Sequence, residues 1–152
     1  MERRVYTVFA QRSDARFLAA DWDLRARRFF DARVGLASAT AYADEPPTHD
    51  DRGVVIARGN APGAIRHVWA RPREPRDLDD AEVADARAGS PGLGLLARRC
   101  GYVFCVECVG DGDRDALLLA AVLASVLLGP ILAPERDRIF GVKTARALLE
   151  RS

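Results

Sequence analysis

The sequence predicts an α+β fold in a single domain over residues 1–152, with about five mostly antiparallel strands and helices packed mainly on one face of the sheet. Short β-branched and aromatic segments alternate with longer segments of helical periodicity. Two of the strand segments flank a Gly/Pro turn, which is typical of an antiparallel hairpin. Residues 116–134 carry no charge, which predicts one long, fully apolar, buried helix near the C-terminus.

The N-terminal part of the chain predicts a strand, a helix and a second strand. Residues 3–11 alternate aromatic and β-branched side chains, as a strand does. Ser13 is the predicted N-cap of a helix over residues 14–33. A second strand is predicted over residues 36–43, before a polar loop over 44–53. The predicted helix has an apolar stripe made of Phe17, Leu18, Trp22, Phe29 and Phe30.

The rest of the chain predicts a hairpin, three helices and a further strand. An Arg/Pro connector over residues 71–77 follows the hairpin, and "YVFCVECV" is the most hydrophobic strand segment. In chain order the predicted elements are a hairpin of residues 54–58 and 65–71, helices over 78–88 and 93–99, a strand over 102–109, the apolar helix and a short helix over 143–152.

The apolar segment 116–134 is long enough to span a bilayer if it is fully helical. Pro130, directly after Gly129, predicts that the helix ends or kinks near Leu128. The basic residues lie downstream of the segment, so the positive-inside rule would keep the C-terminal side in the cytoplasm and place the first 115 residues outside the cell. Those residues contain free thiols, and no N-terminal signal for export is recognised. We therefore predict a buried central helix and no membrane span.

The overall charge does not point to a polyanionic partner. The chain has 23 basic and 22 acidic residues, a net charge of +1, which excludes a global field that would attract nucleic acid or an anionic membrane. All basic residues except Lys143 are arginines. Because arginine has GC-rich codons, this bias indicates a GC-rich genome and not a binding function.

The three cysteines have the C-x4-C-x2-C spacing of the first three ligands of a plant-type [2Fe–2S] cluster. Such ligands need a loop, whereas Cys105 and Cys108 lie in a predicted strand, where they face opposite sides. A fourth ligand is also missing. We predict no cofactor and no metal, with buried thiols in a reducing, cytoplasmic compartment.

The aspartates of "DGDRD" (111–115) resemble the start of a calcium loop. Ala116 stands where the loop needs Gly, and Val122 stands where it needs Glu. The alternative is that Asp111, Asp113 and Asp115 cap the apolar helix and complement its dipole. We favour capping.

The two histidines, His49 and His67, are the remaining candidates for a metal-binding or catalytic role. His49 stands beside Asp50 and Asp51, so this loop could hold a divalent ion in a small metal-dependent hydrolase. His67 alternates with Ile65 and Trp69 on one strand face, which is typical of a packed or edge histidine. No nucleophile–histidine pair can be proposed, so we name no catalytic residues and predict that the chain is not an enzyme.

Two arginine clusters offer contacts to phosphates. Acidic residues share the same segments, so the sequence does not favour an Arg-dependent nucleic-acid binder, which remains an alternative. The clusters are Arg25, Arg27 and Arg28 in the first helix and Arg71, Arg73 and Arg76 in the connector.

The function predicted from the sequence is a non-catalytic, cytoplasmic protein-interaction module. Its partner is a second copy in a homodimer or a larger system to which it docks. The expectation of a homodimer depends on the apolar helix, because the side that bears Leu119, Val122 and Val126 needs cover once the opposite side packs on the sheet.

Overall fold

Seven antiparallel strands form the main sheet in the computed structural model, which describes residues 4–11, 17–37, 44–45, 52–88 and 92–151. Their order is β3-β5-β6-β7-β1-β8-β9, and β2 pairs with β4 in a separate two-stranded sheet. The strands are β1 (Val5–Ala10), β2 (Phe17–Leu18), β3 (Ala32–Leu36), β4 (Asp44–Glu45), β5 (Arg52–Arg58), β6 (Ala64–Pro72), β7 (Tyr102–Glu107), β8 (Ile131–Leu132) and β9 (Ile139–Phe140).

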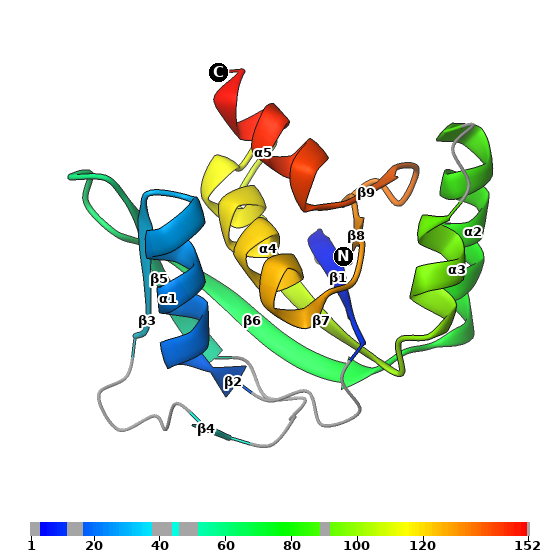
Figure 1. Ribbon diagram of the computed structural model, residues 1–152, viewed down its shortest axis with the longest axis horizontal. Coiled ribbons are helices and arrows are strands. Elements are labelled where there is room, and N and C mark those ends of the chain that lie inside the picture. Colours follow the sequence, from blue (N-terminus) through cyan, green and yellow to red (C-terminus); the bar gives the residue numbers. More distant parts are fainter. Residues whose placement is uncertain (1–3, 12–16, 38–43, 46–51, 89–91, 152) are drawn as a thin grey trace.

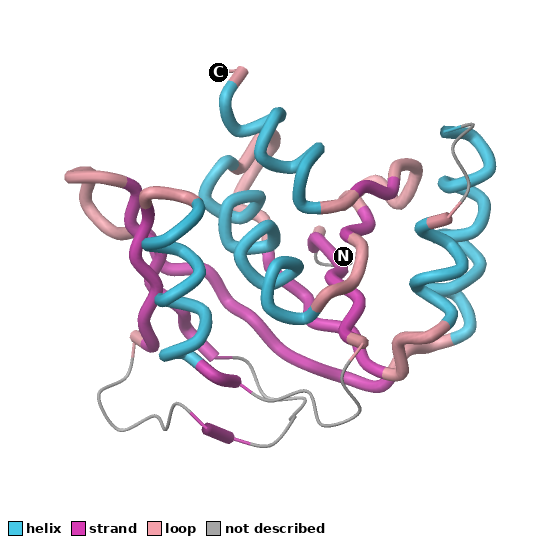
Figure 2. The backbone as a smooth tube through the Cα atoms, in the orientation of Figure 1, coloured by secondary structure: helices cyan, strands magenta, loops and turns pink. Residues whose placement is uncertain are grey.

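Five helices accompany the sheet within the described residues (Figure 2). The α+β class and the antiparallel pairing predicted from the sequence are confirmed. The helices are α1 (Ala19–Phe29), α2 (Pro75–Ala88), α3 (Leu93–Arg98), α4 (Arg114–Leu127) and α5 (Val142–Glu150).

The predicted number of about five strands is wrong, because the main sheet has seven. Strands β8 and β9 contain two residues each and are too short to show a period of two. Strand β8 forms along the free edge of β1, where Thr7 pairs with Leu132 and Val8 with Ile131. Strand β9 pairs in turn with β8. Pairing with a neighbour, and not local propensity, creates these strands.

The predicted helix over residues 14–33 is too long. Helix α1 ends at Phe29, and Asp31 reverses the chain with a φ of 50°. Strand β3 then begins at Ala32, because pairing with β5 buries Val34 opposite Ile56. The predicted strand over 36–43 therefore overlaps β3 only at its first residue, Leu36. Its part from residue 38 onward lies outside the described residues. The predicted N-cap, Ser13, also lies outside them.

The sheet has a hydrophobic cluster on each face. Alternation along the strands separates them: Val8 and Phe104 belong to the cluster under α1, α4 and α5, whereas Phe9 and Cys105 belong to the cluster under α2 and α3. The prediction that helices lie mainly on one face is thus only partly right. Helices α2 and α3 cover the opposite face at one end of the sheet (Figure 1).

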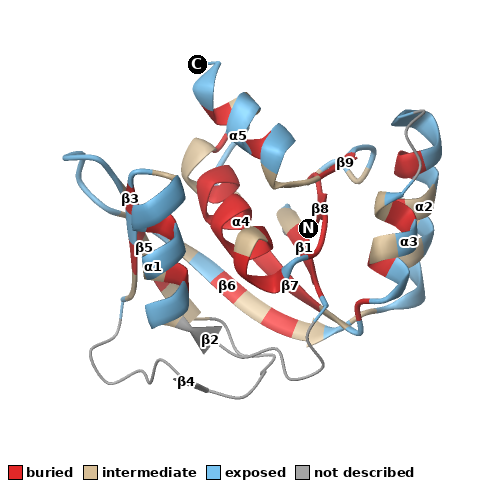
Figure 3. Cartoon of the chain, in the orientation of Figure 1, coloured by how far each residue is buried: buried red, intermediate tan, exposed pale blue. Residues whose placement is uncertain are grey.

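Helix α4 is the centre of the larger cluster (Figure 3). Every residue from Ala116 to Leu127 except Ser125 is buried. The uncharged segment 116–134 is helical only to Leu127, because Leu128 is left-handed and Pro130 cannot continue a helix. Gly129 then packs so closely on β1 that a Cβ there would overlap the carbonyl oxygen of Phe9. Among the described helices, none has both the length and the apolar character needed to cross a bilayer.

The side of α4 that the sequence assigned to a second copy is covered within the chain. Leu119 and Val122 are fully buried, and Val126 is 8% exposed. Helices α1 and α5 both pack against α4, and Trp22 of α1 and Leu149 of α5 belong to the same hydrophobic cluster. This removes the particular reason for which the sequence predicted a homodimer.

Candidate functional site

Helices α1 and α5 both pack against α4 (Figure 1). Two cavities lined by residues of these three helices form a groove between α1 and α5, with α4 as its floor. One end is a cavity of about 630 Å³ that reaches Leu128 and the α3 residue Leu96. The other end is a cavity of about 380 Å³ that reaches Arg58. Phe29 and Arg146 line both cavities, which makes them two ends of one groove.

The larger cavity is lined mainly by apolar side chains that are not fully buried. Phe29 is 40% exposed and Leu128 is 59% exposed. Phe30, Leu96 and Val142 are half-buried beside them. The sequence had assigned Phe29 to the core stripe of the first helix, and this assignment is wrong. Exposed apolar side chains gathered in a concavity are typical of surfaces that bind a partner.

Leu128 projects into the groove because of the way α4 ends. A left-handed residue commonly ends a helix, and it is usually glycine. Here Gly129 is required for the close approach to β1, so the left-handed position falls on Leu128, with φ 60°. The turn is held by hydrogen bonds from Phe9 N–H to the Pro130 carbonyl at 2.9 Å and from Gln11 N–H to the Leu127 carbonyl at 3.0 Å.

Arginines surround the aromatic side chains of the groove. The guanidinium carbons of Arg25 and Arg28 lie 5.8 and 5.4 Å from the ring centroid of Phe29, and that of Arg146 lies 5.9 Å from the ring centroid of Phe30. Cation–π contacts at exposed positions are worth about 0.5–1 kcal/mol each. They hold positive charge at the edge of an apolar floor.

A second cluster of charges lies where α2 meets the sheet, beside a cavity of about 340 Å³. Arg71 donates to both carboxylate oxygens of Asp77 at 2.7 and 3.0 Å, and Arg136 donates to Asp77 at 2.9 Å and also to Asp80. Burial raises the pKa of Asp77, but these hydrogen bonds outweigh burial and leave the pKa below its ordinary value. The carboxylates of this network are paired with arginines of the same chain. Because Asp77 belongs to α2 and Arg71 to β6, these hydrogen bonds hold α2 against the sheet.

Cys105 and Cys108 face opposite sides, as strand alternation predicts, although the strand predicted over 102–109 ends at Glu107 and Cys108 directly follows it. Cys105 is in the cluster under α2 and α3, and Cys108 packs against the cluster on the opposite face. Burial raises the pKa of each of the three thiols, including Cys100, to about 11. Thiols of such high pKa are poor nucleophiles at neutral pH. Among the described residues, His, Cys, Asp and Glu side chains do not gather in a group of three that could hold a metal ion.

The capping role predicted for the "DGDRD" aspartates is confirmed for Asp113. Asp113 is the N-cap of α4 and accepts a hydrogen bond from Ala116 N–H at 3.1 Å. Asp115 lies in the first turn, whereas Asp111 is paired with Arg4. Asp113 also accepts from Arg66 at 2.7 and 3.0 Å, an ion pair that the sequence did not indicate.

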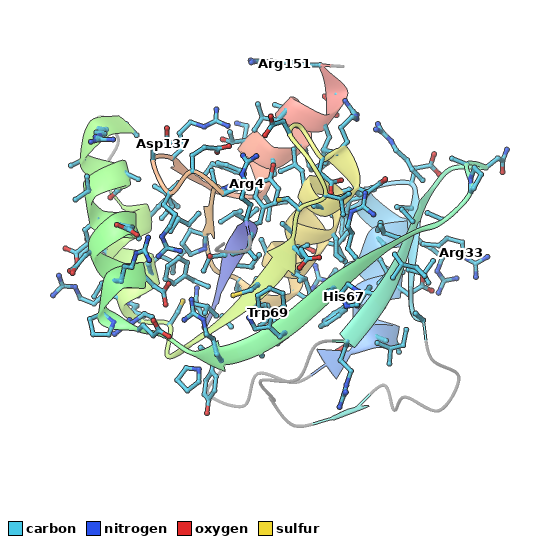
Figure 4. The ribbon with its side chains drawn as sticks, turned by 180° about the vertical axis from the view of Figure 1, so that it is seen from behind. Arg4, Arg33, His67, Trp69, Asp137 and Arg151 are labelled. Atoms are coloured by element: carbon cyan, nitrogen blue, oxygen red, sulfur yellow. The ribbon has the colours of Figure 1, made fainter. Side chains whose placement is uncertain are left out.

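The other residues considered in the sequence are dispersed. The loop with His49, Asp50 and Asp51 lies outside the described residues. His67 is exposed on β6, and Figure 4 shows it with Trp69 on the sheet face turned away from α1 and α4. Arg73 donates to the carbonyl oxygens at the end of α3, at 2.8 to 3.0 Å.

The sequence did not identify the residues of the groove as a binding site. The signal available for it was the pair Phe29–Phe30 beside Arg25, Arg27 and Arg28, which places aromatic side chains next to a cluster of cations. Leu128 carried no such signal, since its exposure depends on the contact between Gly129 and β1. Arg146 lies far away in the sequence and is brought to Phe30 by the packing of α5.

Comparison with protein-family models, with curated proteins and with solved structures finds no match to this chain. The function therefore has to be inferred from the side chains of the chain itself. The groove combines a concave shape, exposed apolar side chains and a basic rim, and these features identify it as the candidate functional site.

Proposed function

We propose that this chain is a non-catalytic protein-interaction module that binds a partner protein in the groove between α1 and α5. The observation that carries the proposal is the exposure of Phe29 and Leu128 in a groove that remains after α4 has been covered. The neighbouring Phe30 and Val142 are already half-buried, so a partner that covers the groove would remove one contiguous apolar surface from water.

A binding role is supported over a catalytic one by the chemistry of the described side chains. The thiols have a raised pKa of about 11, and the buried carboxylate of Asp77 is held by two arginines. Neither arrangement leaves a nucleophile or a base poised near neutral pH. The alternative of a metal-dependent hydrolase depends on His49, Asp50 and Asp51, which lie outside the described residues. The structure therefore adds no support for it.

A foreign partner is favoured over a second copy by the charge of the groove. Two copies related by a two-fold axis through this groove would place one arginine-rich rim on another, since Arg25, Arg28 and Arg146 line the groove of each copy. Like charges placed together in an interface oppose association. We also propose a cytoplasmic location, because Cys100, Cys105 and Cys108 are free thiols and reducing compartments keep thiols in that form.

Site-specific photo-crosslinking in the native host tests the proposal. A photoreactive amino acid replaces Phe29, Leu128 or, as the control, Ile65, which is 54% exposed on the opposite sheet face. We expect one discrete crosslinked protein from positions 29 and 128 and none from position 65. The purified partner should then bind the wild-type chain, and Leu128→Ser should weaken that binding about ten-fold whereas Ile65→Ser should not.

Two results would contradict the proposal. Crosslinking that is equally strong from Ile65 would show that the groove is not the binding surface. Crosslinking only to another copy of the chain, together with a dimer in light scattering of the wild-type protein, would support the homodimer expected from the sequence in place of a foreign partner.

A further inference from the structure

The rim of the groove carries an excess of positive charge. The residues that line its two cavities include five arginines and two acidic residues, Asp31 and Glu150, whereas the whole chain has a net charge of only +1. The rest of the chain is therefore net negative. Lys143 adds a further positive charge on the outer side of α5. The arginines are Arg25, Arg27, Arg28, Arg58 and Arg146.

Most of these cations have no carboxylate of their own. Within the described residues Arg27 pairs with Asp23 at 3.1 Å, but Arg25, Arg28 and Arg146 lie over aromatic rings without an ion pair. Arginines elsewhere in the fold behave differently. Arg66, for example, lies 2.7 Å from the carboxylate of Asp113. The groove thus combines an apolar floor with cations that are available to an external anion.

The walls of the groove indicate the secondary structure of the occupant. An extended peptide gains much of its affinity from backbone hydrogen bonds to the edge of a sheet. Here α1 and α5 form the walls, and the backbone groups in the middle of a helix already bond within the helix. A helix in the groove needs no backbone partners, and it can pack on α1, α4 and α5 as one more helix of a bundle.

We propose that the groove binds an acidic amphipathic helix of a partner protein. This inference rests on the proposed function and adds the chemistry of the partner. The apolar stripe of the helix packs on Phe29, Leu128 and Val142, and its carboxylates lie beside Arg25 and Arg146. With 11 residues in α1, the wall is about 16 Å long, which corresponds to about three helical turns of the occupant.

A flat lipid surface and a nucleic acid fit the groove less well. The apolar residues lie in a concavity between two helices, whereas a lipid-binding helix presents its apolar face outward to the bilayer. A nucleic acid would place phosphates on the arginines but would leave the aliphatic floor around Leu128 and Val142 without a matching apolar surface. Both ligands serve as outcomes of the test.

The test measures the binding of stapled helical peptides of about 15 residues to the full chain by fluorescence anisotropy. One peptide has leucine at positions i, i+3, i+4 and i+7 with glutamate on its other face. The second has lysine in place of glutamate, and the third is a scrambled form of the first. We expect the acidic amphipathic peptide to bind about ten-fold or more tightly than the other two, with an affinity that falls as salt rises.

Charge reversal at one arginine gives a matched comparison. Arg146 lies over Phe30 at 5.9 Å, and Arg138 lies over Phe140 at the same distance but outside the groove. We expect Arg146→Glu to weaken the acidic peptide about ten-fold and to strengthen the lysine peptide, whereas Arg138→Glu changes neither. Circular dichroism of both variants checks that they remain folded.

The inference is overturned if the lysine or scrambled peptide binds wild type as tightly as the acidic one, or if Arg138→Glu has the same effect as Arg146→Glu. It is also overturned if phosphatidylserine vesicles or a single-stranded oligonucleotide bind more tightly than the acidic peptide and depend on Arg146. If none of these peptides binds but a partner is still crosslinked from positions 29 and 128, the acidic helix is rejected and the groove remains the binding surface. Absence of that crosslinking would reject the proposed function itself.

Discussion

Asp113 shows how one residue joins local and tertiary structure. Its carboxylate caps α4 through Ala116 N–H and also accepts from Val109 N–H at 2.7 Å. The same carboxylate pairs with Arg66, and the side chains are only 2% and 14% exposed. The sequence contains the signal for the cap, whereas the ion pair requires β6 to lie beside the start of α4.

Replacement of Asp113 by alanine should destabilise the fold strongly. The change removes the cap and the carboxylate that accepts from Arg66, although Asp115 stays 3.6 Å from that guanidinium, so we expect a loss of about 2–4 kcal/mol in the free energy of unfolding. Urea denaturation measures this. The control is Asp111→Ala, because Asp111 is 92% exposed in its ion pair with Arg4 and should leave the midpoint unchanged. A loss below 1 kcal/mol for Asp113→Ala would contradict the structural role of the pair.

The stability of the fold should fall in acid because of Asp113 and Asp77. Burial raises the pKa of each carboxyl, but hydrogen bonds, above all those from Arg66 and Arg71, outweigh it, so both pKa values lie below the ordinary value. Such a carboxyl stabilises the fold fully above its unfolded pKa, and this contribution is lost as the pH falls through the folded pKa. We expect the loss to begin below about pH 5 and to grow as the pH falls further. Urea midpoints across this range measure it, and Asp113→Asn should flatten the dependence.

At the scale of elements, the end of α4 connects stability with the groove. Leu128 adopts a left-handed backbone conformation that costs an ordinary residue about 1–2 kcal/mol. Its side chain is 59% exposed and lines the groove. Glycine would suit this backbone position better than leucine does, and the proposed binding role gives a reason for the leucine side chain.

Leu128→Gly should separate these two effects. The glycine relieves the left-handed backbone but removes a half-exposed side chain, so we expect the free energy of unfolding to rise by up to about 1 kcal/mol. Binding of the partner or of the acidic peptide should weaken. Gly129→Ala is the contrasting variant, because its Cβ would overlap the carbonyl oxygen of Phe9, and it should destabilise the fold. A marked loss of stability in Leu128→Gly would show that Leu128 is a packing residue.

At the scale of the whole molecule, α4 is enclosed within one chain. The sheet covers one side, and α1 and α5 cover the others, so that Val122 is fully buried. What remains exposed is a narrower surface, the groove between the two covering helices. The apolar surface that the sequence assigned to a dimer thus becomes core, and the candidate interface moves to the edges of the helices around it.

Val122→Asp should unfold the protein. The substitution places a carboxylate without a partner in an apolar core, which costs several kcal/mol. Circular dichroism should show loss of structure at a temperature where the wild type is folded. Val83→Asp on α2, where Val83 is 53% exposed, makes the same chemical change and should stay folded. A folded, monomeric Val122→Asp protein would instead indicate that Val122 lies at an interface between chains.

The sequence by itself determined the features that depend on near neighbours in the chain. The hairpin of β5 and β6, the cap at Asp113 and the end of α4 before Pro130 follow from turn residues, capping chemistry and proline geometry. The opposite orientation of Cys105 and Cys108 follows from strand alternation. Each of these signals lies within a few residues, so it can be recognised without the fold.

Tertiary structure alone decided the features that join distant segments. Strand β8 exists because β1 offers it an edge, and β9 exists because it pairs with β8. The exposure of Leu128 follows from the contact of Gly129 with Phe9. The groove combines Phe29 of α1 with Arg146 of α5, and only the packing of both helices on α4 brings them together. Such contacts depend on which segments meet, and one sequence pattern is compatible with several ways of covering an apolar helix.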